Sequence, residues 1–493
     1  MENAKEEFLG TLSNLYIIFL LAVLPLYNKG TYYMLGDTKY FLFRNVSLIC
    51  VGIWLVLDGI FLFRKKCSIV DICMFCYGAC VIVSTVFSSF RSIAWTGYSD
   101  WYMGALSQLL FVGIYFLVSR GYNGNAIPIY LAEAAFLAVT VIGFLQRLGM
   151  NPLGLFNGYP ENDWVYSHML STLGNINWLC GHYSVMLALP MAGYLYSKKP
   201  WKQILLYIVS VLGLTLLCIQ GSDSGPVIAV VGIGICLLAT WNRPGRFRKA
   251  LLLAIGVLVL FPVMGQLITL FEAQAATPID GDIYAKMQWK IWWILAAFLG
   301  IVCLVLYRVN VRAQKIMIKT LLVVGAISVC GAICLVLVKW QSIFSEGWGS
   351  GRGTLWKMAW DAFAQGNWKQ KLIGAGPDCY AEHLFSIGVT PTIETDGHWS
   401  GAIYANAHNE WLNHLVNLGL LGMAAYFGIF ASSLKRYRGM LLGVLALGMY
   451  GVHSLVSFQQ VMNTPFLFLV LGLCENRYRR AEAESKEAAT SIK

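Results

Sequence analysis

Charged residues are scarce in this chain. Asp, Glu, Lys and Arg make up 12% of its 493 residues, whereas hydrophobic residues make up 58%. Soluble domains contain about 25% charged residues, and a soluble fold has too little interior to bury so much apolar surface. A membrane protein needs about 20 mostly apolar residues for each span. The composition therefore excludes an ordinary soluble protein and predicts an all-α polytopic membrane protein.

Acidic residues are fewer than basic residues, 25 against 36, and the formal net charge is +11. Such a charge also occurs in proteins that bind nucleic acid. Here, however, the basic residues stand in short clusters between apolar runs, for example at 198–199 and 243–249. This pattern is typical of the cytoplasmic loops of membrane proteins. We therefore expect a lipid bilayer, and no nucleic acid, as a partner.

Cysteine is nearly missing from the polar segments. Almost all of the 13 cysteines lie in apolar runs, and the longest polar segment contains only Cys379. Cys73, Cys76 and Cys80 have a spacing that resembles a metal site. No other polar ligand accompanies them, so we interpret them as small hydrophobic residues of a helix.

The apolar runs predict about 12 to 14 transmembrane helices. The first run follows a short polar N-terminus and is interpreted as a span rather than a cleaved signal peptide. The expected spans are 12–27, 41–63, 69–87, 104–118, 128–146, 174–196, 203–219, 224–241, 250–270, 285–307, 316–338, 409–432, 440–458 and 461–475. We expect one transmembrane domain over residues 1–475, then a cytoplasmic polar tail, 476–493, that forms a frayed helix or is disordered.

The basic clusters fall on alternate connections between these spans, which places both termini in the cytoplasm. They lie at 64–66, 198–199, 243–249, 308–315, 435–438 and 477–480. The polar clusters without this basic excess fall on the other side, at 88–91, 174–178, 222–225 and about 339–407. The sequence therefore predicts an extracytoplasmic site.

The polar segment at about 339–407 is too long for a simple connector, and such loops tend to carry function. It ends at His408, where an apolar helix begins with Asn406 as the expected N-cap. A helix N-terminus suits phosphate and disfavours imidazolium. His408 is therefore a candidate general base beside a phosphate; the alternative is an interfacial histidine without a role. Glu410 either caps the first turn or interacts with His414.

Arg352 lies in the sequence Gly349-Ser350-Gly351-Arg352-Gly353, where glycines allow the backbone to approach a ligand. Arginine binds phosphate through a bidentate fork; the alternative is a solvated loop arginine.

Asn175 and Asn177 open a span, and unpaired amides at that depth are costly. Asp223 interrupts an apolar hairpin and is costly for the same reason.

The order of these motifs resembles the O-antigen ligase and O-antigen polymerase superfamily, over about residues 85–430. The resemblance rests on Gln146-x-x-Gly149-x-x-Pro152, Gly174-Asn175-x-Asn177, Ser222–Gly225, Arg352 with Trp356, Gly374-x-Gly376-Pro377, Ala407-His408-Asn409-Glu410-x-Leu412, and Gly419 with Gly422.

The resemblance implies a fold similar to C-type glycosyltransferases. It implies an enzyme that moves a glycan from undecaprenyl pyrophosphate, in the outer leaflet of the bacterial cytoplasmic membrane, to a hydroxyl of a glycan, lipid or protein acceptor. Neither a metal nor a nucleotide cofactor is implied. By this resemblance His408 is the base or acceptor-positioning group, and Arg352 contacts the pyrophosphate. The residues expected to bind substrate are Asn175, Asn177, Arg91, Ser224, Asn409 and Glu410.

One departure concerns the hairpin. Many members carry arginine directly after its serine, but here Gly225 follows Ser224 and Asp223 precedes it. Either Arg91, Arg147 or a lysine near 286–290 supplies the second cation, or this branch handles its donor differently. The sequence leaves polymerase, ligase and protein O-glycosyltransferase open. The alternatives from other classes are a lipid-linked glycan flippase or another secondary transporter, and a non-catalytic assembly scaffold.

Overall fold

The structure is a computed structural model that describes residues 2–59, 66–161, 163–339, 348–395, 398–399 and 403–490. The predicted basic cluster at 64–66 lies outside these ranges except for Lys66. Parts of the predicted extracytoplasmic segment, 340–347, 396–397 and 400–402, also lie outside the described residues.

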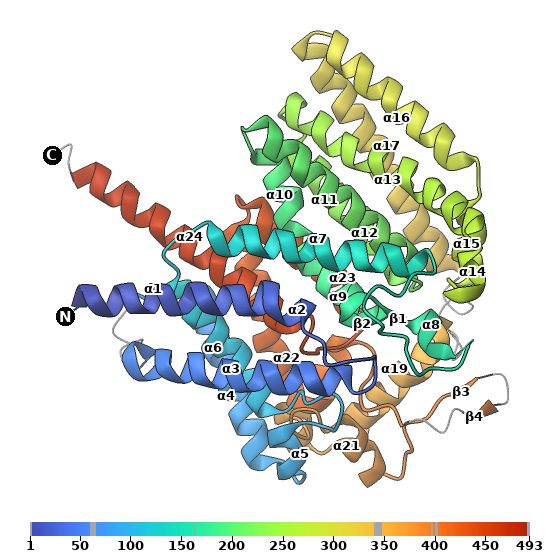
Figure 1. The fold of residues 1–493 in the computed structure, drawn as a ribbon. Coiled ribbons are helices and arrows are strands. Elements are labelled where there is room, and N and C mark those ends of the chain that lie inside the picture. The colour runs from blue at the N-terminus through green and yellow to red at the C-terminus, as the bar shows by residue number, and fades with distance from the viewer. Residues whose placement is uncertain are drawn as a thin grey trace.

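The described chain is almost entirely helical (Figure 1). Its first half contains α1 (Glu2–Ile18), the π-helical turn η1 (Phe19–Val23), α2 (Leu24–Leu26), α3 (Leu35–Leu57), α4 (Ile69–Phe87), α5 (Arg91–Thr96), α6 (Ala105–Gly121), α7 (Ile127–Arg147), α8 (Trp164–His168), the 3-10 turn η3 (Ser171–Leu173), α9 (Ile176–Met186), α10 (Ala188–Tyr196), α11 (Pro200–Ile219) and α12 (Ser224–Thr240). Its second half contains α13 (Pro244–Leu270), α14 (Ala273–Ala276), α15 (Gly281–Met287), α16 (Ile291–Arg308), α17 (Val311–Val338), α19 (Trp348–Gln365), α20 (Trp368–Ile373), α21 (Tyr380–Ser386), α22 (Glu410–Tyr437), α23 (Leu441–Ser454) and α24 (Thr464–Thr490).

Two short antiparallel hairpins complete the described chain. β1 (Met169–Leu170) pairs with β2 (Gly174–Asn175), so that Met169 lies opposite Asn175. β3 (Glu394–Thr395) pairs with β4 (His398–Trp399).

Each expected span overlaps helix among the described residues, and the span expected at 69–87 is α4. The match is not complete: the span expected at 285–307 crosses the break between α15 and α16, and the one at 41–63 extends beyond the described residues. Eight helices of the described residues are long and apolar enough to cross a membrane, and α6, α12 and α23 are shorter apolar helices. The prediction of an all-α polytopic membrane protein is confirmed, whereas the full span count stays a prediction. The polar tail continues α24 as helix as far as Thr490.

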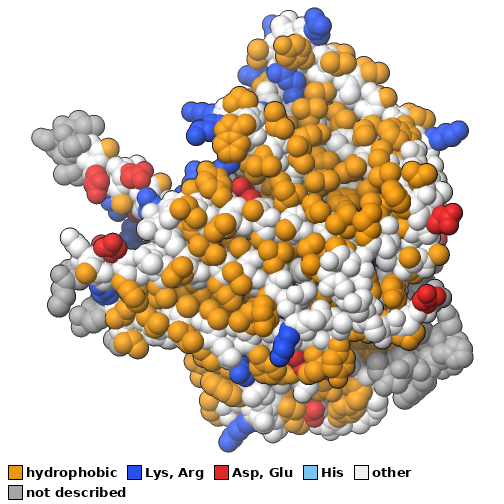
Figure 2. Space-filling view, viewed as in Figure 1, with side chains coloured by type: hydrophobic (Ala, Val, Ile, Leu, Met, Phe, Trp, Pro, Cys, Tyr) orange, Lys and Arg blue, Asp and Glu red, His pale blue; other side chains and the backbone are white. Residues whose placement is uncertain are grey.

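Large apolar side chains cover the outside of the bundle. Ile49, Val230 and Leu304 are each more than 60% exposed. Hydrophobic side chains cover most of the face in Figure 2, while charged side chains lie mainly at its margins. A soluble protein rarely exposes apolar patches of this extent, so this surface fits the acyl chains of a bilayer.

The two termini lie at the same end of the bundle, on the left in Figure 1, and α8, α14, α15 and α19 lie toward the opposite end. The segment after α17, expected to be a polar loop, is mostly helical where it is described. Its helices pack on α22 through a small apolar core of Ala359, Ala362, Tyr380, Leu384, Ala407 and Val416. The segment therefore has helices of its own, because these apolar residues give α19 and α21 a face to bury.

Asp71, an acid within an apolar run, has a structural role at the end of the bundle near the termini. With Ser68 it forms a capping box at the start of α4. Its Oδ2 also pairs with Arg120, 3.0 Å away, and with Arg479. These partners satisfy a buried carboxylate that would otherwise be costly and tie α4 to α6 and α24.

Candidate active site

His408 lies in the turn that leads into α22, half-buried and in the left-handed backbone region, with φ of 47°. Its backbone N–H donates to Asn406 Oδ1, 3.1 Å away. Its ring packs edge-to-face on Phe458 and Tyr404, with ring centroids 4.9 and 5.7 Å away. A strained turn and two aromatic rings therefore fix the direction of the imidazole.

The N-cap of α22 is Asn409, not Asn406 as expected from the sequence. Asn409 Oδ1 accepts hydrogen bonds from the N–H groups of Trp411 and Leu412, both 3.0 Å away. Its Nδ2 donates to the carbonyl of Leu455 at 2.9 Å. Two asparagines stand before this helix, and the one nearer to it caps it, while Asn406 closes the turn that holds His408. The side chain of Asn409 thus contacts protein on both sides.

Arg352 lies in the first turns of α19, where Gly349 and Gly351 adopt left-handed backbone conformations. Its Nε donates to the carbonyl of Val456, 3.0 Å away, and its Nη1 donates to the carbonyl of Gly349. The guanidinium is thereby fixed against the loop that follows α23, the loop that also contains Phe458. This placement brings Arg352 toward His408 and differs from a freely solvated loop arginine.

The charge of Arg352 acts directly on His408. Burial, and secondly the positive charge of Arg352, lower the pKa of His408 to about 3. The imidazole is therefore neutral at physiological pH, as the sequence predicted. The reason differs, because the prediction relied on the helix N-terminus, whereas burial and a neighbouring cation are the causes in the structure. Burial also lowers the pKa of Arg352, while Asp223 raises it.

The Asn-x-Asn motif and the serine hairpin form one hydrogen-bonded unit. Asn175 caps α9, and its Oδ1 accepts from the N–H of Asn177 at 2.8 Å. Ser222 Oγ donates to Asn177 Oδ1 at 3.0 Å and lies 3.0 Å from Ser224 Oγ. Asn177 and Ser222 are 45 residues apart in the chain, and their hydrogen bond joins the two motifs at the N-terminal ends of α9 and α12.

Asp223 is close enough to Arg352 to interact with its charge. This interaction explains how the hairpin can carry an acidic residue, in a motif where many family members carry an arginine. The two side chains interact electrostatically, so the arginine offsets the carboxylate that would otherwise repel a phosphate. The cations considered for the second site lie elsewhere. Arg91 is exposed at the first residue of α5, and Lys286 and Lys290 are exposed in and after α15.

Arg147 is fully buried at the end of α7. Its Nη2 donates to the carbonyl of Gln220, and Nη1 donates to that of Pro278 at 3.5 Å. Gln220 lies two residues before Ser222, the first residue of the serine hairpin. Arg147 therefore holds the base of the hairpin, and its burial separates it from solvent.

Residues 283–427 match a family model described as O-antigen ligase. The match covers less than half of the chain and supports a relationship to the O-antigen ligase and O-antigen polymerase superfamily. The matched region contains Arg352, the Gly374–Pro377 turn and His408. The Asn-x-Asn motif and the serine hairpin precede it in the chain. No curated protein matches the chain.

The matched region also includes Glu410. The sequence predicted that its side chain caps the first turn of α22 or interacts with His414, but the side chain does neither. The carboxylate is fully buried and accepts hydrogen bonds from Tyr426 and, at 2.9 Å, from Tyr450. His414 Nδ1 instead lies 2.7 Å from the backbone carbonyl of Glu410. The acid points into the bundle because two tyrosine hydroxyls compensate its burial there. It therefore ties the His408 end of α22 to α23.

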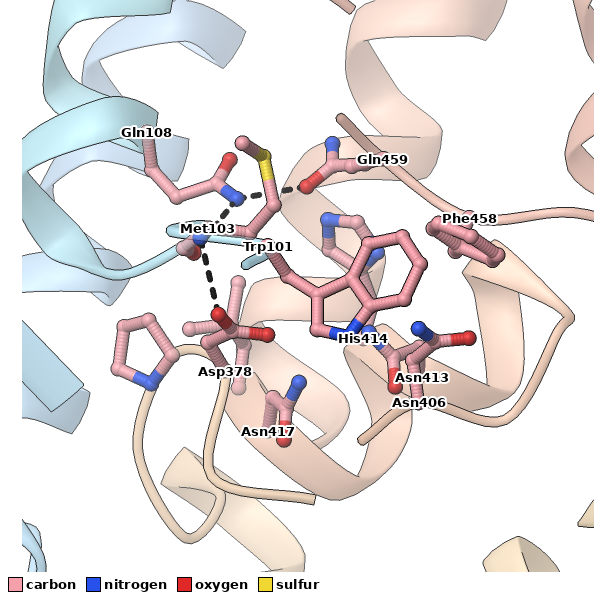
Figure 3. Close-up of a pocket in the computed structure, with 12 residues that line it drawn as sticks. Trp101, Met103, Gln108, Asp378, Asn406, Asn413, His414, Asn417, Phe458 and Gln459 are labelled. Carbon is pink, nitrogen blue, oxygen red and sulfur yellow. Dashed lines mark hydrogen bonds between the residues drawn. The ribbon is translucent and has the colours of Figure 1, made fainter. Parts of the chain in front are cut away.

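Sequence analysis missed a polar pocket beside His408, shown in Figure 3. It is lined by Trp101, Met103, Gln108, Pro377, Asp378, Asn406, Asn413, His414, Asn417, Leu418, Phe458 and Gln459. The sequence of the matched region did contain an indication of this pocket. Asp378 follows the Gly374-x-Gly376-Pro377 turn, and Asn413 and Asn417 lie four residues apart on the helix after His408.

Proposed function

We propose that this protein transfers a glycan from undecaprenyl pyrophosphate to an acceptor hydroxyl at the outer face of the bacterial cytoplasmic membrane. The match of residues 283–427 to the O-antigen ligase family supports membrane glycan transfer in general. The observation that carries the finer proposal is the approach of Arg352 to a neutral histidine, His408, and to the serine hairpin. This combination offers a cation for a leaving pyrophosphate and a base for a hydroxyl.

Arg352 neutralises the charge that develops on the pyrophosphate when the bond to the sugar breaks. A fixed cation in a partly buried site stabilises such charge more strongly than one in water. Its guanidinium is already held by two backbone carbonyls, so little reorganisation accompanies donor binding. The negative charge of Asp223 partly offsets the positive charge of Arg352 until the donor binds.

His408 accepts the proton of the acceptor hydroxyl, whose oxygen attacks the anomeric carbon as the bond to pyrophosphate breaks. A pKa of about 3 makes the free imidazole a weak base. A bound pyrophosphate offsets the positive charge of Arg352, which is one cause of that low pKa. Donor binding therefore raises the basicity of His408, so that the base becomes effective when the donor is present.

The remaining site residues have supporting roles in this proposal. Asn175 and Asn177, fixed to each other and to Ser222, orient sugar or phosphate oxygens of the donor with Ser224. Arg91, exposed at the start of α5, is proposed to contact the donor before it is seated. Asn409 and Glu410 act through the protein, since both side chains hold the segment that carries His408.

The test compares wild type, His408→Gln and Arg352→Lys in matched amounts in the native host. Surface glycans and undecaprenyl-linked glycans are profiled together. We expect both variants to accumulate the lipid-linked donor and to lose one surface polymer. The exposed residue His168 provides the matched control, and His168→Gln should behave as wild type.

A wild-type glycan profile in correctly expressed His408→Gln would overturn the proposed role of His408. Loss of the polymer on deletion of the whole gene, with no effect of either substitution, would favour transport or scaffolding. Purified protein in sealed vesicles then separates these, because a transporter moves the lipid-linked glycan across without covalent transfer.

A further inference from the structure

The polar pocket beside His408 joins segments that are far apart in the chain. Trp101 comes from the turn before α6, Asp378 from the turn before α21, Asn417 from α22 and Phe458 from the loop after α23. Figure 3 shows these side chains around one space. The cavity measures about 20 Å³, which accommodates one water molecule or one hydroxyl group.

Asn417 has an unsatisfied polar atom at this pocket. The residue is 4% exposed, and its Oδ1 has no hydrogen-bond partner among the described residues. Its backbone carbonyl, in contrast, accepts from Ser84 Oγ and from the N–H of Gly376, both at 2.9 Å. Asn417 lines the pocket, and Figure 3 shows its side-chain nitrogen on the side of Asp378 and its oxygen on the opposite side. A buried amide oxygen without a partner is costly, and a polar ligand in the pocket would offset that cost.

Asp378 and a pair of glutamines supply further hydrogen-bonding groups. Asp378 Oδ2 accepts from the N–H groups of Tyr98 and Met103, at 2.8 and 2.9 Å. Burial raises the pKa of Asp378 to about 6, so its carboxyl accepts above that pH and can also donate below it. Gln108 Nε2 donates to Gln459 Oε1 at 2.7 Å. These bonds fix the Asp378 carboxyl and the two glutamine side chains in the wall of the pocket.

Aromatic rings stand between this wall and His408. Trp101 packs edge-to-face on Phe458 with ring centroids 4.8 Å apart, and Phe458 packs on His408 at 4.9 Å. An aromatic surface next to amides and a carboxyl offers the apolar contact and the hydrogen bonds that a sugar ring requires. Arg352 and the serine hairpin do not line this pocket in the described structure.

We infer that this pocket is a saccharide subsite that receives one hydroxyl or hydroxymethyl group of the acceptor sugar, while the ring rests on Trp101 and Phe458 beside His408. The inference rests on the proposed function, because it takes the sugar to be an acceptor. Asn417 and Asp378 bind the inserted hydroxyl, and Phe458 directs the neighbouring hydroxyl toward His408. The subsite thus selects the acceptor rather than the donor.

The test measures binding of small glycosides to the purified full-length protein in nanodiscs by saturation-transfer difference NMR. The probes are methyl glycosides of glucose, galactose, mannose and N-acetylglucosamine, together with their monodeoxy derivatives. Wild type should bind at least one glycoside and bind one of its monodeoxy derivatives about 10-fold more weakly, because the pocket's polar groups lose a partner.

Asn417→Leu should bind the parent glycoside about 10-fold more weakly and no longer distinguish it from the deoxy derivative. Its thermal stability should be unchanged or higher, because an unpaired buried amide has been removed. Trp101→Leu, at the mouth of the pocket, is a second variant that should weaken all glycosides alike. Asn14 provides the control, since its Oδ1 is also buried without a described partner but lies in α1; Asn14→Leu should bind glycosides as wild type does.

The inference is overturned if no glycoside binds to wild type, or if Asn417→Leu binds and discriminates as wild type does. The cavity then holds an ordered water only. The proposed function fails separately. His408→Gln should keep glycoside binding and lose transfer, and full transfer by that variant would overturn the catalytic role while the binding results still support the subsite.

Discussion

Gly374 and Gly419 approach each other so closely that neither has room for a side chain. A Cβ on Gly374 would lie 2.1 Å from the backbone oxygen of Asn417, and one on Gly419 would lie 2.6 Å from the backbone nitrogen of Gly374. Gly419 breaks α22 with φ of 67° and ψ of −169°. The break frees the carbonyls of Val416 and Asn417, which accept from Ala375 and Gly376 at 3.0 and 2.9 Å. The glycine turn is thereby fastened to the helix that follows His408.

Gly419→Ala should therefore destabilise the protein by about 3 kcal/mol or more, because it combines a strained φ with a backbone clash. The measurement is thermal unfolding in detergent, followed by tryptophan fluorescence. Gly52 is the matched control, since a Cβ there would meet nothing within 4 Å. Gly52→Ala should leave the protein as stable or slightly more so. Equal midpoints for the two variants would contradict the interlocked packing.

The low pKa of His408 predicts how the rate of transfer depends on pH. Arg352→Gln removes a positive charge that favours the neutral imidazole, so the pKa of His408 should rise from about 3. Burial remains, and the pKa should stay below its usual 6.5. The acid limb of the pH–rate profile should therefore move to higher pH. Residual transfer of purified protein, measured over a pH series, checks this.

Arg352→Lys retains the charge and serves as the comparison. Its acid limb should stay near that of wild type, while its rate falls by about 10-fold or more, since an ammonium cannot form the bidentate fork. An unmoved acid limb in Arg352→Gln would show that the charge of Arg352 has no influence on the catalytic base.

Ser222→Ala should weaken transfer, because Ser222 links Asn177 to Ser224. One hydrogen bond of this kind contributes about 1 kcal/mol, so we expect a decrease of roughly 5-fold in kcat/KM. Ser92→Ala, at an exposed residue of α5, should have no effect. If Ser222→Ala retained full activity, the joined motifs would be a packing feature of the fold.

Asp378→Asn should change how stability depends on pH. Burial raises the pKa of Asp378 from 3.8 to about 6, so the folded state binds more protons than the unfolded state between these values. Wild type therefore loses stability as pH rises through this window, by at most about 3 kcal/mol, whereas asparagine does not titrate. The midpoint of Asp378→Asn should rise relative to wild type from pH 4 to pH 6 and then stay level. Thermal unfolding across this range checks it, and a constant difference would mean that the carboxyl is ionised in the fold.

Some features of the site were predictable from short stretches of sequence. The order of the motifs indicated His408 and Arg352, whose catalytic roles stay predictions. The neutral state of the histidine was predicted from its place at a helix start, whereas burial and the charge of Arg352 cause it in the structure. Which asparagine caps α22 was not predictable, because Asn406 and Asn409 are equally good caps. The choice depends on Asn409 Nδ2 reaching the carbonyl of Leu455, a contact with a distant segment.

The sequence by itself determined where the apolar helices lie and the resemblance to the O-antigen ligase superfamily. Apolar runs must be helical in a bilayer, since every backbone polar group needs a partner within its own segment. Only the tertiary structure decided what surrounds each polar group. It joined Asn177 to Ser222, turned Glu410 toward Tyr426 and Tyr450, and closed a pocket around Asn417. Such contacts depend on how helices from distant parts of the chain pack, and no local pattern encodes that packing.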